Sequence, residues 1–377
     1  MLSAAILVAA CSPTAAEPTT TSLIPVTTTT SAPPSPIPAA VPRAVDVDPG
    51  DAAPPLPEQP AGTPFPDTDF PEGDLPSDVD DVALTAAIDR AIGDGTGAHA
   101  RAVVIVHAGR IVAERYAAGD DADTVMPSFS VSKSVASAAL GIMVGDGLLD
   151  PAQAAPVDQW QDPADPRSSI TIDDLLRMSG GLAWREQDDR GLDLLALLAA
   201  DDPVAYAVSK PLEATPGTTF TYSTGTTSIL AQIMEDAAGG PDALVSLLES
   251  RLFAPIGMEP IELRTDETGT WLAGYSADTT ARGFARFGLL ILRDGVWDGV
   301  RILPPGWVDR MRTPTPAEPG YGAHWRLDIE RPGVMIARGL RGQLIAVDPR
   351  HDLVVVVLST DRPTSDDLLR AVFGAFD

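Results

Sequence analysis

The hydrophobic positions of this chain follow no regular period before about residue 78. Thr, Pro, Ala and Asp dominate this first part, which includes a threonine run at 27–30 and two Pro-Pro pairs. A segment without an apolar face cannot bury enough surface to offset the loss of chain entropy. We therefore predict a disordered Thr/Pro/Ala-rich linker over residues 12–77 and a folded domain over residues 78–377.

Within the folded part, the apolar spacing changes type along the chain. Two apolar runs at 102–107 and 111–116, joined by Ala108-Gly109-Arg110, indicate a β-hairpin. Further strands are predicted late in the chain, at 321–327, 334–340, 343–347 and 353–358. Helical spacing predicts helices at 84–92, 130–145, 173–178, 192–200, 227–238, 241–252, 279–293 and 365–376.

This order of elements predicts an α/β (α+β) fold. The economical arrangement is one antiparallel sheet built from both ends of the chain and flanked by helices, with an all-helical subdomain at about 146–315 inserted between its strands. The run Val354-Val355-Val356-Val357 is apolar throughout, so this strand should be buried on both faces. A cleft between sheet and helical subdomain is the expected place for a site.

Composition removes several classes of function. A formal net charge of −27 argues against nucleic-acid binding and against docking on anionic lipid head groups. The single cysteine, Cys11, excludes an intrachain disulfide. None of the four histidines is paired at metal-ligand spacing, so no metal site is expected.

The first residues point to a different role for Cys11. Residues 1–10 are apolar, and Val8-Ala9-Ala10-Cys11 resembles a bacterial lipobox. That resemblance implies a signal over residues 1–11, lipidation of Cys11 and an extracytoplasmic place on the bacterial cell surface. The usual basic stretch is missing before the apolar run, which leaves an upstream start open. We expect membrane contact only through this lipid anchor, unless the protein is secreted.

The candidate chemistry centres on Ser130 and Lys133. At this spacing the two side chains share one face at the start of a helix, where the helix dipole favours a developing negative charge. Lys133 and Lys210 are the only lysines in a chain whose other basic residues are arginine. An amine that can lose its proton would activate the serine hydroxyl as a nucleophile. The alternative is that Ser130 only caps the helix.

A second segment, Tyr222-Ser223-Thr224, makes the pattern specific. Together with Ser130-x-x-Lys133, the Asp173–Leu182 run and the Arg338–Gln343 run, it resembles the serine β-lactamase/penicillin-binding-protein-like superfamily. Within this superfamily the chain is most similar to the class C branch, of the esterase and 6-aminohexanoate-dimer hydrolase type. Thr224 departs from the usual asparagine of the Tyr-x-Asn motif. The similarity runs from about residue 81 to the C-terminus.

The resemblance implies a β-lactamase/transpeptidase-like fold and a cofactor-free acyl-enzyme mechanism. Ser130 would be the nucleophile, and Lys133 and Tyr222 would share the general base and acid work. The backbone N–H groups of Ser130 and Leu340 would hold the oxyanion. Gly339 would let the substrate approach the strand edge, and Thr224 would contact the substrate.

The third family motif departs most. Ala337-Arg338-Gly339 stands where the family has Lys-Thr-Gly, so the usual cation is absent. Because neighbouring strand side chains point to opposite faces, Arg338 should point away from the site. We therefore expect weak β-lactamase activity and a preference for uncharged short acyl esters or small amides. His324 is interpreted as a structural strand residue, because no acidic partner can be assigned to it.

The leading interpretation is a serine hydrolase that acts on a small-molecule or peptide ester or amide. Two alternatives stay open. One is a D-amino-acid peptidase or carboxypeptidase that acts on cell-wall peptides. The other is a non-catalytic module that binds wall fragments, against which the intact Ser130, Lys133 and Tyr222 argue. Neither the natural substrate nor the oligomeric state follows from the sequence.

Overall fold

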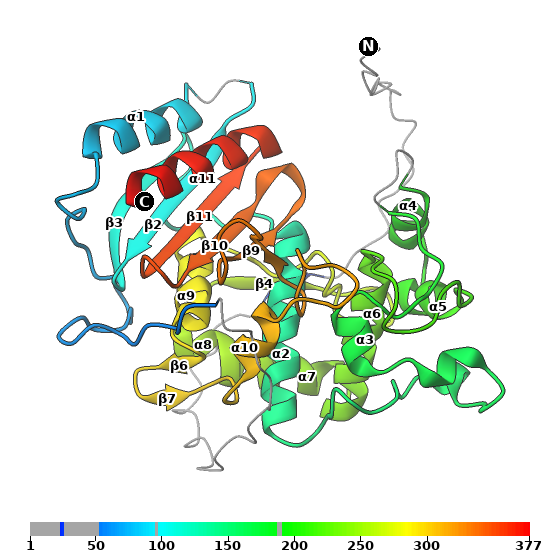
Figure 1. Ribbon diagram of the computed structural model, residues 1–377. Coiled ribbons are helices and arrows are strands. Elements are labelled where there is room, and N and C mark those ends of the chain that lie inside the picture. Colours follow the sequence, from blue (N-terminus) through cyan, green and yellow to red (C-terminus); the bar gives the residue numbers. More distant parts are fainter. Residues whose placement is uncertain (1–22, 26–52, 95–96, 187–190) are drawn as a thin grey trace.

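A six-stranded antiparallel sheet forms the centre of the computed structural model, which describes residues 23–25, 53–94, 97–186 and 191–377 (Figure 1). The strand order is β3-β2-β11-β10-β9-β8. The bounds of these strands are β2 (Ala100–His107), β3 (Arg110–Tyr116), β8 (Arg326–Leu327), β9 (Met335–Arg338), β10 (Leu344–Asp348) and β11 (Leu353–Ser359). Strands from both ends of the chain therefore share one sheet, as predicted.

The sheet is covered on both faces, and β11 is buried along its whole length. Val354 and Val356 pack into the larger core with helices α2 (Ser132–Gly145) and α9 (Ala281–Leu292). Val355 and Val357 pack on the opposite face under α1 (Asp81–Ile92) and α11 (Arg362–Phe376). Figure 1 shows α1 and α11 side by side over that face. The predicted two-sided burial of this strand is confirmed.

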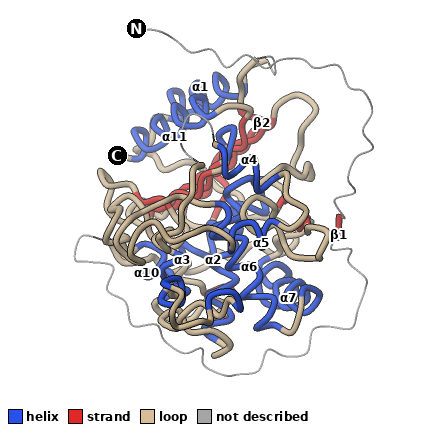
Figure 2. Tube along the Cα trace, turned by 90° about the vertical axis from the view of Figure 1, so that its right-hand side faces the viewer, coloured by secondary structure: helices blue, strands red, loops and turns tan. Residues whose placement is uncertain are grey.

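The helical subdomain lies on the α2 side of the sheet, away from α1 and α11 (Figure 2). Its helices are α3 (Ile172–Leu176), α4 (Leu192–Leu198), α5 (Pro203–Val208), α6 (Thr224–Ala238), α7 (Pro241–Leu248) and α8 (Ala254–Ile256). Small strands and one later helix complete the described elements: β1 (Leu23–Pro25), β4 (Ile261–Arg264), β5 (Asp278–Thr279), β6 (Val296–Trp297), β7 (Val300–Arg301) and α10 (Trp307–Arg312).

Helix α9 differs from its predicted place in the inserted subdomain. It packs directly on β2, β10 and β11. Gly288 allows this close approach, because an added Cβ there would lie 2.5 Å from Val354 Cγ1 and 2.9 Å from Ile345 Cγ2. The helical insertion therefore ends before α9 and not at about residue 315.

The predicted strand at 321–327 is also shorter than expected. Only Arg326–Leu327 pair as β8, and His324 has a φ of +60°, outside strand geometry. The Ser134 hydroxyl donates to the carbonyl of His324 at 2.8 Å, and the Ser137 hydroxyl donates to that of Ala323 at 3.0 Å. These carbonyls are bound to α2, and a strand ladder is not formed.

Residues 53–77 pack on the domain, in contrast to the disordered linker predicted over 12–77. Phe70 is 4% exposed in the larger core, and Glu72 forms a bridge with Ile111 on β3. Residues 23–25 form β1, which pairs with β4. The remainder of that linker and the predicted signal, including Cys11, lie outside the described residues.

Neither a membrane-spanning helix nor a cluster of metal ligands occurs among the described residues. No helix in those ranges is both long and apolar enough to cross a membrane. The same ranges contain no group of three or more His, Cys, Asp or Glu side chains arranged to hold a metal ion.

Candidate active site

Ser130 lies in a single 3₁₀ turn, Phe129–Val131, that leads directly into α2. Phe129 has a φ of +45°, in the left-handed region that few non-glycine residues adopt. The preceding Ser128 holds this turn in place, because its N–H and its hydroxyl both donate to Asp278 Oδ1 at 2.8 Å. The loop that carries Ser130 is thus fixed to the segment before α9.

Lys133 is 1% exposed and points back at Ser130 from the first turn of α2. Its Nζ lies within hydrogen-bond distance of three oxygens: Ser130 Oγ at 3.1 Å, Thr224 Oγ1 at 3.0 Å and Gly274 O at 2.7 Å. The structure therefore brings together the Ser130 and Lys133 predicted from their spacing. It adds Gly274, where an added Cβ would lie 2.6 Å from Thr224 Cγ2.

Thr224 is the first residue of α6, whose N-terminus is capped by the Ser223 side chain. Its N–H donates to Glu186 Oε2 at 2.6 Å, and its hydroxyl donates to Glu186 Oε1 at 2.7 Å. Trp184 Nε1 donates to the same Oε2 at 2.8 Å. Sequence reasoning missed Glu186, because it lies 38 residues from Thr224 and in no recognisable motif.

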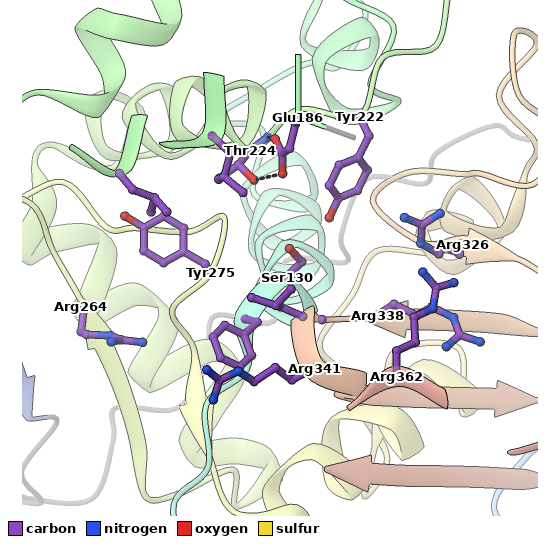
Figure 3. A pocket seen from close by; sticks show the side chains of 15 residues that line it. Ser130, Glu186, Tyr222, Thr224, Arg264, Tyr275, Arg326, Arg338, Arg341 and Arg362 are labelled. Atoms are coloured by element: carbon purple, nitrogen blue, oxygen red, sulfur yellow. Dashed lines mark hydrogen bonds between the residues drawn. The ribbon is translucent and has the colours of Figure 1, made fainter. Parts of the chain in front are cut away.

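Tyr222 lies beside this cluster, near both Lys133 and Arg326. Its ring centroid is 5.1 Å from Lys133 Nζ and 5.3 Å from Arg326 Cζ. Its hydroxyl points into the same part of the cavity as the Ser130 hydroxyl (Figure 3). The phenol is therefore placed where it can exchange a proton with a group bound at Ser130.

Gly339 and Leu340 follow the end of β9 and line the same cavity as Ser130. A Cβ on Gly339 would lie 2.5 Å from Ser128 O and 3.1 Å from Phe129 Cβ, so only glycine lets the two backbones come this close. Leu340 is 66% exposed. The end of β9 thus lies against the Phe129–Val131 turn that carries Ser130, the arrangement that the predicted two-part oxyanion site requires.

The cavity above Ser130 has a volume of about 470 Å³ and an arginine-rich wall (Figure 3). Tyr222, Thr224 and Glu186 line it together with apolar side chains such as Leu194 and Leu198. Its arginines come from four separate parts of the chain: Arg264, Arg326, Arg338, Arg341 and Arg362. This concentration of positive charge stands out in a protein with a net charge of −27.

The expectation that Arg338 points away from the site is wrong. Ala337 is 1% exposed and belongs to the larger core, so it takes the core-facing side of β9. Arg338 lies on the other face of β9, with Ile336, and forms an ion pair with Asp366 of α11, yet it still lines the cavity at the end of the strand. The expectation assumed that Ala337 faces the site, whereas its side chain faces the core.

His324 lies behind the site, as a structural residue. Its Nδ1 donates to Leu176 O at 2.7 Å, and its Nε2 accepts the Thr227 hydroxyl at 3.1 Å. Burial, with a smaller contribution from the positive charge of Lys133, lowers the pKa of His324 to about 3. Both ring nitrogens are in use and the ring stays neutral, so the structural interpretation holds although the strand assignment does not.

Comparison with known proteins agrees with this geometry. The Beta-lactamase family profile matches residues 86–375. The 6-aminohexanoate-dimer hydrolase of Paenarthrobacter ureafaciens is 27% identical over 299 residues, which cover 69% of this chain and 72% of that protein. The D-aminopeptidase of Brucella anthropi is 34% identical over 175 residues, but these cover only 43% of this chain and 31% of that protein.

Among solved structures, the hydrolase EstCE1, described as having promiscuous acyltransferase activity, superposes with a TM-score of 0.63. The identity is 18%, and the match covers 78% of this chain and 98% of that one. At this identity the likeness establishes the fold alone, which is β-lactamase/transpeptidase-like, as predicted. From the profile match over most of its length, the chain belongs to the Beta-lactamase family of serine hydrolases.

Proposed function

We propose that this protein hydrolyses ester or amide bonds through an acyl-enzyme formed on Ser130. The observation that carries the proposal is the 3.1 Å contact between Lys133 Nζ and Ser130 Oγ at the base of the cavity. Ser130 Oγ attacks the substrate carbonyl as its proton moves to Lys133 and Tyr222. The proton then passes to the leaving group, and water hydrolyses the acyl-serine by the reverse sequence.

The negative oxygen of the tetrahedral intermediate would be bound by the backbone N–H groups of Ser130 and Leu340. The approach of Gly339 to Ser128 and Phe129 supports this assignment, because it brings the end of β9 next to the nucleophile turn. The N-terminal end of α2 adds positive potential at the same place.

The arginines support a substrate that carries a carboxylate. Arg264 is ion-paired with Asp278, and Arg338 and Arg362 share Asp366. Arg326 lies over the Tyr222 ring, and the guanidinium of Arg341 adds an exposed charge at the rim. The wall therefore carries more positive than negative charge. This replaces the expected preference for uncharged esters and favours a substrate with a free carboxylate, as a carboxypeptidase substrate has.

Labelling with a fluorophosphonate tests the catalytic proposal. We expect a single modified residue, Ser130, when the labelled protein is digested and mapped, and no labelling of Ser130→Ala. Full hydrolytic activity in purified Ser130→Ala would overturn the proposal. The alternative of a non-catalytic wall-fragment-binding module predicts no labelling of either protein.

A matched substrate pair tests the charge preference. 4-Butyryloxyphenylacetate and its primary amide have the same acyl group and nearly the same leaving group, and only the first is charged. We expect a higher kcat/KM for the carboxylate than for the amide. In Arg341→Gln the ratio of the two kcat/KM values should fall about fivefold, because one exposed charge contact contributes about 1 kcal/mol. Equal kcat/KM values for the two esters would contradict the carboxylate preference without affecting the role of Ser130.

We also propose that the protein is a lipoprotein of the bacterial cell surface and belongs to the class C branch. The lipobox-like run before Cys11 motivates the first part. Cys11→Ser should move the protein from the membrane fraction to the soluble fraction of an expressing bacterium, without changing kcat or KM. Unchanged membrane retention would count against the lipid anchor.

A further inference from the structure

A chain of hydrogen bonds leads from Glu186 through Thr224 to Lys133 and ends at Ser130. We propose that Glu186 is a positioning residue, which acts through the Thr224 hydroxyl to aim the lone pair of the neutral Lys133 amine at Ser130 Oγ. This inference rests on the proposed function of Ser130 and Lys133. It gives a task to a carboxylate that no motif in the sequence identifies.

Glu186 is the acceptor of hydrogen bonds from Thr224 and Trp184. An ionised carboxylate only accepts hydrogen bonds, and this one receives three. Oε2 takes the backbone N–H of Thr224 at 2.6 Å and Trp184 Nε1–H at 2.8 Å, both of which can only donate. Oε1 takes the Thr224 hydroxyl at 2.7 Å. The hydroxyl proton of Thr224 is therefore committed to Glu186, and its lone pairs face Lys133.

Lys133 faces two hydrogen-bond acceptors besides Ser130. Gly274 O, at 2.7 Å, can only accept, and Thr224 Oγ1, at 3.0 Å, is left to accept as well. A neutral amine has two hydrogens, and these two acceptors take both. The third direction around Nζ, toward Ser130 Oγ at 3.1 Å, must then hold the lone pair.

This orientation is the one the reaction needs. The O–H bond of Ser130 breaks and an N–H bond forms on Lys133. The electron pair left on Oγ forms the bond to the substrate carbonyl carbon, and the carbonyl π electrons move to the oxygen held by the N–H donors. A lone pair directed at Thr224 instead would leave an N–H facing Ser130, and no proton could be taken.

Glu186→Gln should reverse the direction of the hydrogen bonds that lead from residue 186 to Lys133, without moving the side chains. The side-chain oxygen of Gln must serve the two N–H donors of Thr224 and Trp184, which places its NH₂ group against Thr224 Oγ1. That NH₂ donates to the hydroxyl, so the hydroxyl proton is free to point at Lys133 Nζ. The Thr224 proton then occupies the lone pair that Ser130 needs.

Other charged or titratable groups also face Lys133. The centroid of the Tyr222 ring lies 5.1 Å from Lys133 Nζ and 5.3 Å from Arg326 Cζ. His324 is coupled to Lys133 by charge but stays neutral. Of these groups, Glu186 is the carboxylate that contacts the amine through a single hydroxyl.

The test is the pH dependence of kcat and KM with 4-nitrophenyl butyrate. In Glu186→Gln we expect kcat to fall about tenfold or more, a part of what general-base catalysis supplies, with KM changed less than about twofold. Loss of the negative charge disfavours the ammonium form, so the acidic limb of the profile should move to lower pH. A merely structural role would scale the whole profile and leave the limb in place.

Three further variants make the test specific. Glu213→Gln removes the same charge from an exposed carboxylate that pairs with Arg185, and it should leave the profile unchanged. Thr224→Ser keeps the hydroxyl and should retain most of kcat, whereas Thr224→Val should lose it. Adding Glu186→Gln to Thr224→Val should cost little more, because the two residues act through one hydroxyl.

The outcomes separate this inference from the proposed function. Wild-type kcat and an unmoved acidic limb in Glu186→Gln, with Ser130→Ala inactive, would overturn the role of Glu186 alone. Additive losses in the double variant would do the same. Activity in Ser130→Ala would overturn the proposed function itself.

Discussion

Ser130 and Lys133 meet at the base of the cavity, and their effects on turnover should not add. We expect Ser130→Ala and Lys133→Ala each to lower kcat by about a thousandfold or more, and the double variant to be little worse than either, because removing one partner leaves the other without a function. Steady-state kinetics on the three purified variants measure this.

The other lysine gives a matched control for Lys133→Ala. Lys210 is ion-paired with Asp193 and lies 4.0 Å from the Tyr206 ring centroid, within the helical subdomain. Lys210→Ala should lower thermal stability but keep turnover in the folded fraction. A Lys133→Ala protein that turns over substrate like Lys210→Ala would sink the assignment of the base.

Gly339 supplies a second prediction at the scale of one residue. Its φ of −113° is open to alanine, so strain in the backbone is not the obstacle. The added Cβ would meet Ser128 O at 2.5 Å, and backbone atoms cannot move aside as a flexible side chain can. Gly339→Ala should therefore push the end of β9 away from the nucleophile turn and lower kcat more than KM.

Gly374 is the matched control for this substitution. It lies within α11, and an added Cβ would have no neighbour within 4 Å. Gly374→Ala should leave kcat unchanged and raise the free energy of unfolding by roughly 0.5–1 kcal/mol, because alanine is the better helix former. Similar kcat values in Gly339→Ala and Gly374→Ala would contradict the close approach as a requirement for turnover.

At the scale of single elements, the hydrophobic pattern predicts a helix or strand correctly where the side chains pack as that pattern requires. The unbroken apolar run along β11 predicts its burial on both faces, and the helical spacing after Ser130 predicts α2. The strand predicted around His324 does not form, because the hydroxyls of Ser134 and Ser137 in α2 donate hydrogen bonds to backbone carbonyls of this segment. Such contacts join residues 186 or more positions apart, and no local pattern records them.

Helix α6 contains a buried carboxylate that should make stability depend on pH. Glu235 is 2% exposed, and burial, with Asp266 and Asp236 nearby, raises its pKa to about 7. The folded state therefore binds a proton that the unfolded state releases at lower pH. The stability that protonated Glu235 contributes is fully present below about pH 4.5 and is lost as the pH rises through about 7.

Glu235→Gln should remove this pH dependence. The Gln oxygen can still accept the Trp271 N–H, which now reaches Glu235 Oε1 at 2.7 Å. We expect nearly equal unfolding free energies at about pH 4, and a variant more stable by about 2–3 kcal/mol at about pH 8.5, from about 1.4 kcal/mol per unit of pKa shift. Urea unfolding at both pH values measures this.

The exposed Glu330 offers the control for that experiment, since Glu330→Gln removes a charge without removing a buried one. It should leave the difference between the two pH values as in the unmodified protein. If Glu235→Gln behaves like Glu330→Gln, the raised pKa of Glu235 has no consequence for stability.

At the scale of the whole molecule, the sheet built from both ends of the chain follows from the order of elements. The sequence did not reveal that residues 53–77 belong to the domain. Their apolar side chains are few and irregularly spaced among prolines, so they show no period. The segment is held to the domain by three buried arginines, which donate hydrogen bonds to acceptors in residues 53–77.

Each of these arginines depends on the segment for hydrogen bonds. Arg286 donates to Asp67 O at 3.0 Å, Arg293 donates to Gln59 Oε1 at 2.8 Å, and Arg312 donates to Pro54 O at 2.5 Å. All three are less than 9% exposed. Arg293 and Arg312 also form ion pairs with Asp352 and Asp309, but a buried guanidinium that loses one of its acceptors keeps a larger part of its desolvation cost uncompensated.

A chain that lacks residues 1–77, the predicted signal and linker together, should therefore be much less stable than a chain that lacks only residues 1–52. Hydrogen bonds to charged groups contribute about 1.5–3 kcal/mol each, so three of them correspond to at least about 4 kcal/mol. The shorter deletion removes only β1 from the described structure and should change the unfolding free energy little. Phe70→Ala in the full chain tests the apolar part, with an expected loss of about 3 kcal/mol. Equal denaturant midpoints for the two shortened chains would show that residues 53–77 lie on the domain without stabilising it.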